Sequence, residues 1–149
     1  MTNDAGKKGK WMGIDYGQAR IGLAVSDPMG LFARGLETIN WNGQDLAWGL
    51  ARIEALIQEH QVIGLVVGIP RRTDGKASDS EDQARKLAAV LAERTGLPTV
   101  LRDERYTTVL ASRIMRETGI RKERRKSVVD QIAAEIILQE YLESLRKGD

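Results

Sequence analysis

The chain contains no cysteine and only one histidine among its 149 residues. The absence of cysteine excludes disulfides, thiolate nucleophiles and zinc–thiolate sites, and it is typical of a protein from a reducing cytosol. The single histidine, His60, excludes chemistry that needs two imidazoles. No apolar run approaches the roughly 20 residues of a membrane span, and the N-terminal residues lack the apolar stretch of a secretory signal. We therefore expect a soluble cytoplasmic protein with no membrane contact.

The size and charge of the chain indicate one domain with an uneven surface. With 42% hydrophobic residues, 149 residues form one core. We expect a flexible N-terminal tail over residues 1–10 and a single domain over 11–149. The net charge is only +2, yet residues 102–126 include nine basic and four acidic side chains. That stripe indicates either a polyanionic partner, because cations on phosphates release counterions, or a solvated helix face and loop.

The apolar pattern changes period along the chain. Short apolar runs with turn residues between them predict strands, and apolar residues at helical spacing predict helices. The predicted strands are residues 11–15, 21–26, 32–39, 62–69 and 97–101. The predicted helices are 46 to near 60, 78 or 79 to 96, 107–117 and 127–145, with a basic loop at 121–126. Trp41 and Trp48 are expected to be packing residues of the first helix rather than platforms for bases.

This order of elements predicts an α/β fold. A hairpin or meander of antiparallel strands comes first, and parallel strands joined by helical crossovers follow, which gives a five-stranded mixed sheet flanked by helices on both faces. Ligands of open α/β sheets bind outside the carboxyl ends of the parallel strands. The ends of the first, fourth and fifth strands are therefore the expected place for chemistry.

Acidic residues stand at two of these strand ends. Asp15 ends the first strand between Gly13 and Gly17, and Asp103 and Glu104 follow the fifth. Carboxylates that lie close together repel one another unless they share a cation or a proton. The alternative is structural: Asp15 caps the turn, and Asp103 or Glu104 pairs with a neighbouring arginine.

A third acid lies on the apolar side of the last helix. Asp130 shares a helical face with Ala133, Ala134, Ile137 and Tyr141, while the polar stripe lies about 100° away. An ionised carboxylate on an apolar face is unfavourable unless it is paired or binds a metal. A cap in the first helical turn is the structural alternative.

Three acids without histidine or cysteine partners suit Mg²⁺ or Mn²⁺, which prefer oxygen ligands. Two such ions about 3.5–4 Å apart activate a water and stabilise the leaving oxygen of a phosphodiester. The hypothesis is metal-dependent hydrolysis of a nucleic-acid backbone.

Four blocks, "GIDYGQARIGLAVSD" (13–27), "VVGIPRRTDG" (66–75), "DERYTT" (103–108) and "VVDQIAAEIILQEYL" (128–142), resemble in order and spacing the bacterial YqgF family. This family is also called RuvX and is described as Holliday junction resolvases or pre-16S ribosomal RNA nucleases. The resemblance implies a ribonuclease H-like fold and a catalytic, metal-binding site of three acids, Asp15, Glu104 and Asp130. Asp103 is the weaker candidate, because adjacent strand residues face opposite ways.

Several basic residues are candidate contacts for nucleic acid. Each also has a structural interpretation as a solvated loop or turn residue, and Arg105 could instead steer the neighbouring acid. The candidates are Arg20, Arg71, Arg72, Lys76, Arg105, Arg124, Arg125 and Lys126.

The resemblance implies a nuclease for structured RNA, in 5′ processing of pre-16S rRNA during ribosome biogenesis. A Holliday junction resolvase acting on branched DNA is the alternative with the same chemistry, and a homodimer would then be needed in place of a monomer. A non-catalytic nucleic-acid scaffold is an alternative of another class. The first block is also similar to the phosphate-binding hairpin of sugar-kinase ATPases, but these bind nucleotide between two domains, which 149 residues do not supply.

Overall fold

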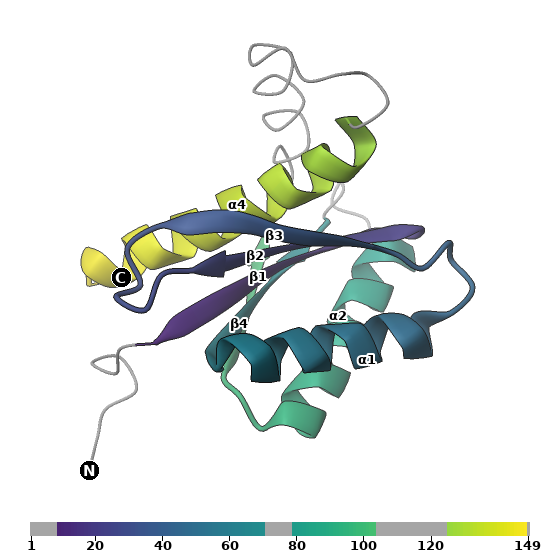
Figure 1. The fold of residues 1–149 in the computed structure, drawn as a ribbon, viewed down its shortest axis with the longest axis horizontal. Coiled ribbons are helices and arrows are strands. Elements are labelled where there is room, and N and C mark those ends of the chain that lie inside the picture. The colour runs from purple at the N-terminus through teal and green to yellow at the C-terminus, as the bar shows by residue number, and fades with distance from the viewer. Residues whose placement is uncertain (1–8, 71–78, 104–124, 149) are drawn as a thin grey trace.

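The computed structural model describes residues 9–70, 79–103 and 125–148, with the side chains of 125–127 left out (Figure 1). Five strands form one sheet in the order β3-β2-β1-β4-β5. The pairs β1–β2 and β2–β3 are antiparallel, while β1–β4 and β4–β5 are parallel. The strands are β1 (Lys10–Tyr16), β2 (Arg20–Ser26), β3 (Ala33–Asn40), β4 (Val62–Ile69) and β5 (Thr99–Asp103). The predicted mixed sheet is confirmed.

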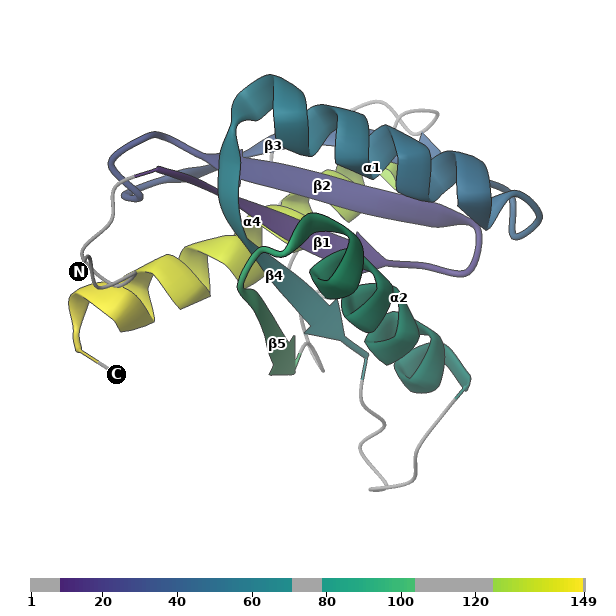
Figure 2. The same ribbon diagram turned by 90° about the horizontal axis from the view of Figure 1, so that it is seen from below.

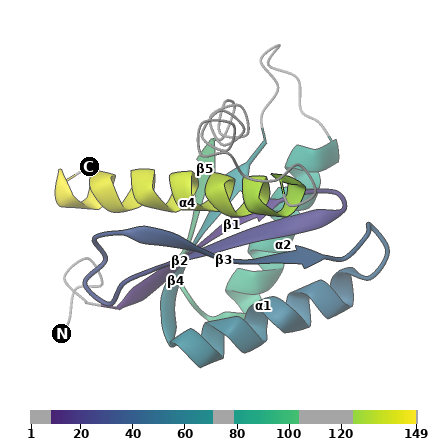
Figure 3. The same ribbon diagram turned by 45° about the horizontal axis from the view of Figure 1, so that its top comes forward.

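Helices cover both faces of this sheet. One face carries α1 (Leu46–His60) and α2 (Asp79–Thr95), and the other carries α4 (Arg125–Arg146), so that the molecule has three layers (Figure 3). The predicted bounds of α1 and α2 agree with the structure. The helix predicted over 107–117 and residues 121–124 of the basic loop lie outside the described residues. No helix in the described ranges is long and apolar enough to cross a membrane.

The two faces of the sheet differ in side-chain size. Large apolar side chains of β1, β2 and β4 point toward α1 and α2 and form the larger core. The opposite face has glycines where α4 and Trp11 come close: a Cβ atom on Gly13 would lie 2.7 Å from the Ala134 carbonyl oxygen, and one on Gly64 would overlap the Trp11 ring. Small residues on this face therefore allow the α4 backbone to lie directly on the strands.

The strand β5 begins two residues later than predicted. Gly96, with φ of 70°, ends α2, and the chain turns through Leu97 and Pro98 before it joins the ladder. Proline has no N–H to donate to a ladder, and the Pro98 carbonyl accepts a hydrogen bond from the Leu65 N–H at 2.8 Å. The shift makes Asp103 the last residue of the strand instead of a residue beyond it.

The two tryptophans near α1 have different environments. Trp41 is buried, and its Nε1 donates to the Gly17 carbonyl at 3.1 Å, as expected of a packing residue. Trp48 is half exposed, so its predicted packing role is wrong. The inward face of α1 follows Gly49, Ile53, Leu56 and Ile57, and Trp48 precedes Gly49 by one residue, which turns it about 100° away.

The polar stripe of α4 lies against the edge strand β3. Three of its side chains bond to the segment 31–38, and two of them, Gln139 and Glu135, satisfy main-chain groups there. Gln139 accepts from the Ala33 N–H at 2.8 Å and donates to the Leu31 carbonyl at 3.0 Å, Glu135 accepts from the Gly35 N–H at 2.5 Å, and Gln131 donates to Thr38 Oγ1 at 3.2 Å. The helix therefore covers part of an edge that would otherwise be available to another strand.

Candidate active site

Asp15 lies on the face of β1 that α4 covers. Side chains alternate along a strand, and Met12, Ile14 and Tyr16 belong to the core beneath α1 and α2. Gly13, two residues before Asp15, is in contact with α4. The half-buried Asp15 therefore points to the same side as Gly13.

Glycines flank Asp15 on both neighbouring strands. Its ladder partners are Gly22 in the antiparallel strand β2 and Gly68 in the parallel strand β4. Directly opposite residues of a sheet share a face, so neither neighbour places a side chain beside the carboxylate. The space above Gly22 is occupied by the α4 backbone, which lies next to Asp15 on its β2 side.

Asp130 of α4 lies above one of these glycines. A Cβ atom on Gly22 would lie 2.8 Å from Asp130 Cβ, and ladder partners have Cβ positions about 5 Å apart. The Cβ atoms of Asp15 and Asp130 are therefore within about 8 Å of each other. Because α4 begins at Arg125, Asp130 lies in the second helical turn, and the alternative of a first-turn cap is wrong.

Arg20 is the ionic partner of Asp130. Its Nε donates to Asp130 Oδ2 at 2.7 Å; the Arg20 side chain is 33% exposed and that of Asp130 is 16% exposed. Arg20 and Gly22 lie two residues apart on β2, so both face α4. Burial raises the pKa of the Asp130 carboxyl, and Arg20 offsets part of that effect. No local pattern in the sequence identifies this pair, because 110 residues separate its members.

The end of β5 turns Asp103 away from the other two acids. Asp103 is the ladder partner of Ile69, which faces the core beneath α1 and α2. The preceding residue, Arg102, faces α4, where it lies 3.9 Å from Glu140. The alternation of β5 thus separates Asp103 from the face of Asp15 and Asp130. Glu104 lies outside the described residues.

Three hydrogen bonds fix the strand end that carries Asp15. Hydrogen bonds join the β1–β2 hairpin to α2 and to the segment before α1. They run from the Tyr16 hydroxyl to Gln83 Oε1 at 2.6 Å, from Gln18 Nε2 to Ser80 Oγ at 3.0 Å, and from Trp41 to the Gly17 carbonyl. Burial raises the pKa of Tyr16, so the phenol stays a neutral donor. Such anchoring holds the Asp15 carboxylate in one position.

The carboxylates of Asp15 and Asp130 suit a hard divalent cation, and the third predicted ligand, Glu104, lies outside the described residues. Within residues 9–70, 79–103 and 125–148, no three His, Cys, Asp or Glu side chains gather as a metal site. Asp15 and Asp130 share a face, and the Arg20 guanidinium already provides a positive charge there. Oxygen ligands of this kind fit Mg²⁺ or Mn²⁺ better than metals that prefer nitrogen or sulfur.

The remaining predicted site residues are all basic, and the structure describes none of their side chains. Arg125 and Lys126 belong to the first turn of α4, and their side chains are not described. Outside the described residues lie Arg71, Arg72, Lys76, Arg105 and Arg124.

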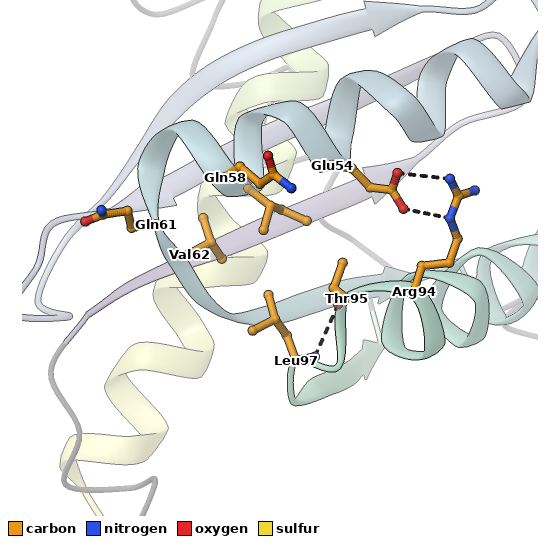
Figure 4. A pocket seen from close by; sticks show the side chains of 8 residues that line it. Glu54, Gln58, Gln61, Val62, Arg94, Thr95 and Leu97 are labelled. Carbon is orange, nitrogen blue, oxygen red and sulfur yellow. Dashed lines mark hydrogen bonds and ion pairs between the residues drawn. The ribbon is translucent and has the colours of Figure 1, made fainter.

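A cavity of about 610 Å³ lies elsewhere in the molecule, between the C-terminal ends of α1 and α2 (Figure 4). An ion pair between Arg94 and Glu54, at 2.7 Å, joins the two helices across it. Val62 in its wall begins β4, whereas Gly68, the partner of Asp15, is near the end of that strand. Figure 2 shows α1 and α2 on the sheet face opposite α4. The cavity therefore lies on the opposite face of the sheet from Asp15 and Asp130, the acidic site, and at the opposite end of β4.

The curated relatives cover nearly the whole chain. A protein of Leuconostoc citreum is 42% identical over 134 residues, which are 89% of this chain and 94% of that protein, and one of Acetivibrio thermocellus is 45% identical over 137 residues, which are 91% and 96%. Both carry the name "Putative pre-16S rRNA nuclease".

Solved structures support the fold. The Thermus thermophilus RuvC structure superposes with a TM-score of 0.58 at 19% identity over 93% of this chain and 96% of that one. The fowlpox virus Holliday junction resolvase superposes with a TM-score of 0.57 at 12% identity over 91% and 99%. The predicted ribonuclease H-like architecture is that of these resolvases.

A family model described as "RuvX: Holliday junction resolvase" matches residues 9–144. With this match and with relatives above 40% identity, the chain belongs to the RuvX family.

Proposed function

We propose that this protein is a metal-dependent endonuclease that hydrolyses phosphodiester bonds of structured nucleic acid. The observation that carries the proposal is the position of Asp15 and Asp130 on one face of the sheet, with glycines on both sides of Asp15. Two carboxylates this close together can hold divalent cations next to a phosphate. The names of the relatives support the same reaction class.

Asp15 and Asp130, together with Glu104, are the proposed metal ligands and catalytic residues. The orientation of Asp103 toward the opposite face supports Glu104 as the third acid. Bound Mg²⁺ or Mn²⁺, as a pair of ions, supplies an activated water and stabilises the leaving oxygen. Asp15 is held by the central strand β1, and Asp130 by the helix α4 that packs on the sheet, so the two carboxylates are kept close together.

The proposed substrate is structured RNA, with 5′-end processing of pre-16S rRNA in the cytoplasm as the biological reaction. The shared name of the relatives at 42% and 45% identity supports this substrate. Contacts to phosphates are assigned to the basic residues that the sequence predicts for nucleic-acid binding, because lysines and arginines that neutralise phosphates give most of the affinity for a polyanion. They are Arg20, Arg71, Arg72, Lys76, Arg105, Arg124, Arg125 and Lys126.

The experiment is a cleavage assay with a short structured RNA in Mg²⁺ or Mn²⁺, comparing wild type, Asp15→Asn and Asp103→Asn. Asp15→Asn should lose at least about a hundredfold in rate, since metal-ligand carboxylates stabilise charge in the transition state. Asp103→Asn is the matched control, because its side chain faces away from the site. Equal rates for wild type and Asp15→Asn would refute the metal site, and binding without any cleavage would favour a scaffold.

A Holliday junction resolvase is the second candidate, supported by the description of the matching family model. A resolvase cuts two strands symmetrically and therefore needs a dimer. Cleavage of a four-way DNA junction, measured beside the structured RNA and with light scattering to give the mass in solution, separates the two candidates. A monomer that leaves the junction intact and cleaves the RNA excludes the resolvase.

A further inference from the structure

The Arg20 guanidinium contacts Asp130 through one nitrogen only. Nε donates to Oδ2 at 2.7 Å, whereas an arginine–carboxylate pair of the strongest kind uses two parallel bonds. The four N–H groups of the two terminal nitrogens take no part in this contact. The contact is also incompletely buried, since a third of the Arg20 side chain is exposed. A single, partly solvated hydrogen bond is easier to exchange for another partner than a buried bidentate pair.

A cation and Arg20 cannot both use the same carboxylate without repulsion. The guanidinium keeps its charge at any ordinary pH, and a divalent ion bound to Asp130 would lie a few ångströms from it in a partly buried site. Like charges at that separation repel more strongly than they would in bulk water. Within the described residues, Arg20 is the cation that contacts Asp130.

We propose that Arg20 is the resident counter-ion of Asp130 and that a divalent cation displaces it, which turns its guanidinium toward the phosphate of the substrate. The inference rests on the proposed function, because it takes Asp130 as a metal ligand. Arg20 is then a positioning residue in the metal-free protein, where it neutralises the half-buried Asp130 carboxylate. After exchange, its planar fork of donors suits a phosphate oxygen pair. The same side chain thus couples loading of the cation to binding of the substrate.

The test measures Mn²⁺ affinity of the full-length protein by titration calorimetry in the absence of nucleic acid. Arg20→Gln removes the competing charge, so it should bind Mn²⁺ roughly three- to tenfold more tightly than wild type. Arg20→Lys keeps the charge and should stay closer to wild type. Arg52→Gln is the control for loss of an arginine–carboxylate pair elsewhere. Arg52 of α1 pairs with Glu37 of β3 through two hydrogen bonds, at 2.8 and 2.7 Å, on the sheet face opposite Asp15 and Asp130.

Four outcomes separate the inference from the function on which it rests. Tighter binding by Arg20→Gln alone supports the exchange. Unchanged or weaker binding by Arg20→Gln, with binding lost in Asp130→Asn, overturns the exchange and leaves the metal site standing. Equal tightening by Arg20→Gln and Arg20→Lys would mean that space, and not charge, limits binding, which also overturns it. Wild-type affinity in Asp130→Asn refutes the metal site and the exchange together. Circular dichroism of each variant checks that it is folded.

Discussion

Gly22 of β2 lies directly beneath the main chain of Asp130 in α4. A side chain at Gly22 would overlap the Asp130 carbonyl group and would come within 2.8 Å of its Cβ. The same glycine is the ladder partner of Asp15. One residue without a side chain therefore determines both how closely α4 lies on the sheet and how near the two candidate ligands are to each other.

Gly22→Ala should destabilise the protein by about 3 kcal/mol or more, at the upper end of what overpacked sites lose, because the clash involves helix backbone that cannot rotate away. Gly49→Ala is the control. A Cβ there would have ordinary contacts of 3.7 Å or longer, and alanine favours a helix interior by about 1 kcal/mol. Urea unfolding should give opposite signs for the two variants, and a small loss for Gly22→Ala would mean that α4 can shift.

The two members of the Arg20–Asp130 pair should have opposite effects on stability in a chelating buffer. Burial raises the pKa of the Asp130 carboxyl, so its contribution to stability is present below the unfolded pKa and is lost as the pH rises through the folded value. Asp130→Asn should therefore unfold at a higher temperature than wild type at neutral pH, with a gain of about 1 kcal/mol typical of removing a functional charge.

Arg20→Gln should instead lose about 1–3 kcal/mol, because it leaves a half-buried carboxylate without its partner. Calorimetric unfolding of both variants, each with excess chelator, measures this asymmetry. Destabilisation of similar size in both would show that the ion pair stabilises the fold in its own right and that burial of Asp130 is not the dominant effect.

Local periodicity was sufficient to predict most of the fold. The apolar run 62–69 and the helical spacing from Leu46 to His60 match β4 and α1 at both ends. Asp130 is a candidate on its sequence position alone, because a charged residue on an apolar helix face is unfavourable without a partner. These signals are local, so a single sequence contains them.

What could not be predicted depends on contacts between distant segments. The pairing of Arg20 with Asp130 requires the packing of α4 on β2, and no pattern near either residue encodes it. The helical spacing defines the polar stripe of α4 but not its partner, and in the structure Gln139 of this stripe bonds to main-chain groups of Leu31 and Ala33. The role of Glu104 as a metal ligand stays a prediction, because Glu104 lies outside the described residues.

Gln139→Ala should expose part of the β3 edge. It removes the bonds to the Ala33 N–H and the Leu31 carbonyl, with an expected loss of about 1–2 kcal/mol. An uncovered edge can pair with another chain, so light scattering should reveal self-association that grows with concentration. Glu140→Ala is the matched control one residue along, since the polar contact of Glu140 among the described residues is a long one, 3.9 Å to Arg102. Equal behaviour of both variants would contradict this role of Gln139.

Asp27 makes the stability of the β2–β3 turn depend on pH. Its carboxylate accepts from the N–H groups of Phe32 at 2.7 Å and of Leu31 and Met29 at 2.9 Å, and the Phe32 bond is the largest cause of its lowered pKa. A lowered folded pKa gives stability that is present above the ordinary value of 3.8 and is lost as the pH falls through the folded value. Asp27→Ala should therefore lose about 1–2 kcal/mol at pH 7. In urea unfolding from about pH 7 to pH 3, the gap to wild type should narrow, whereas a constant gap would assign the effect to turn shape and not to charge.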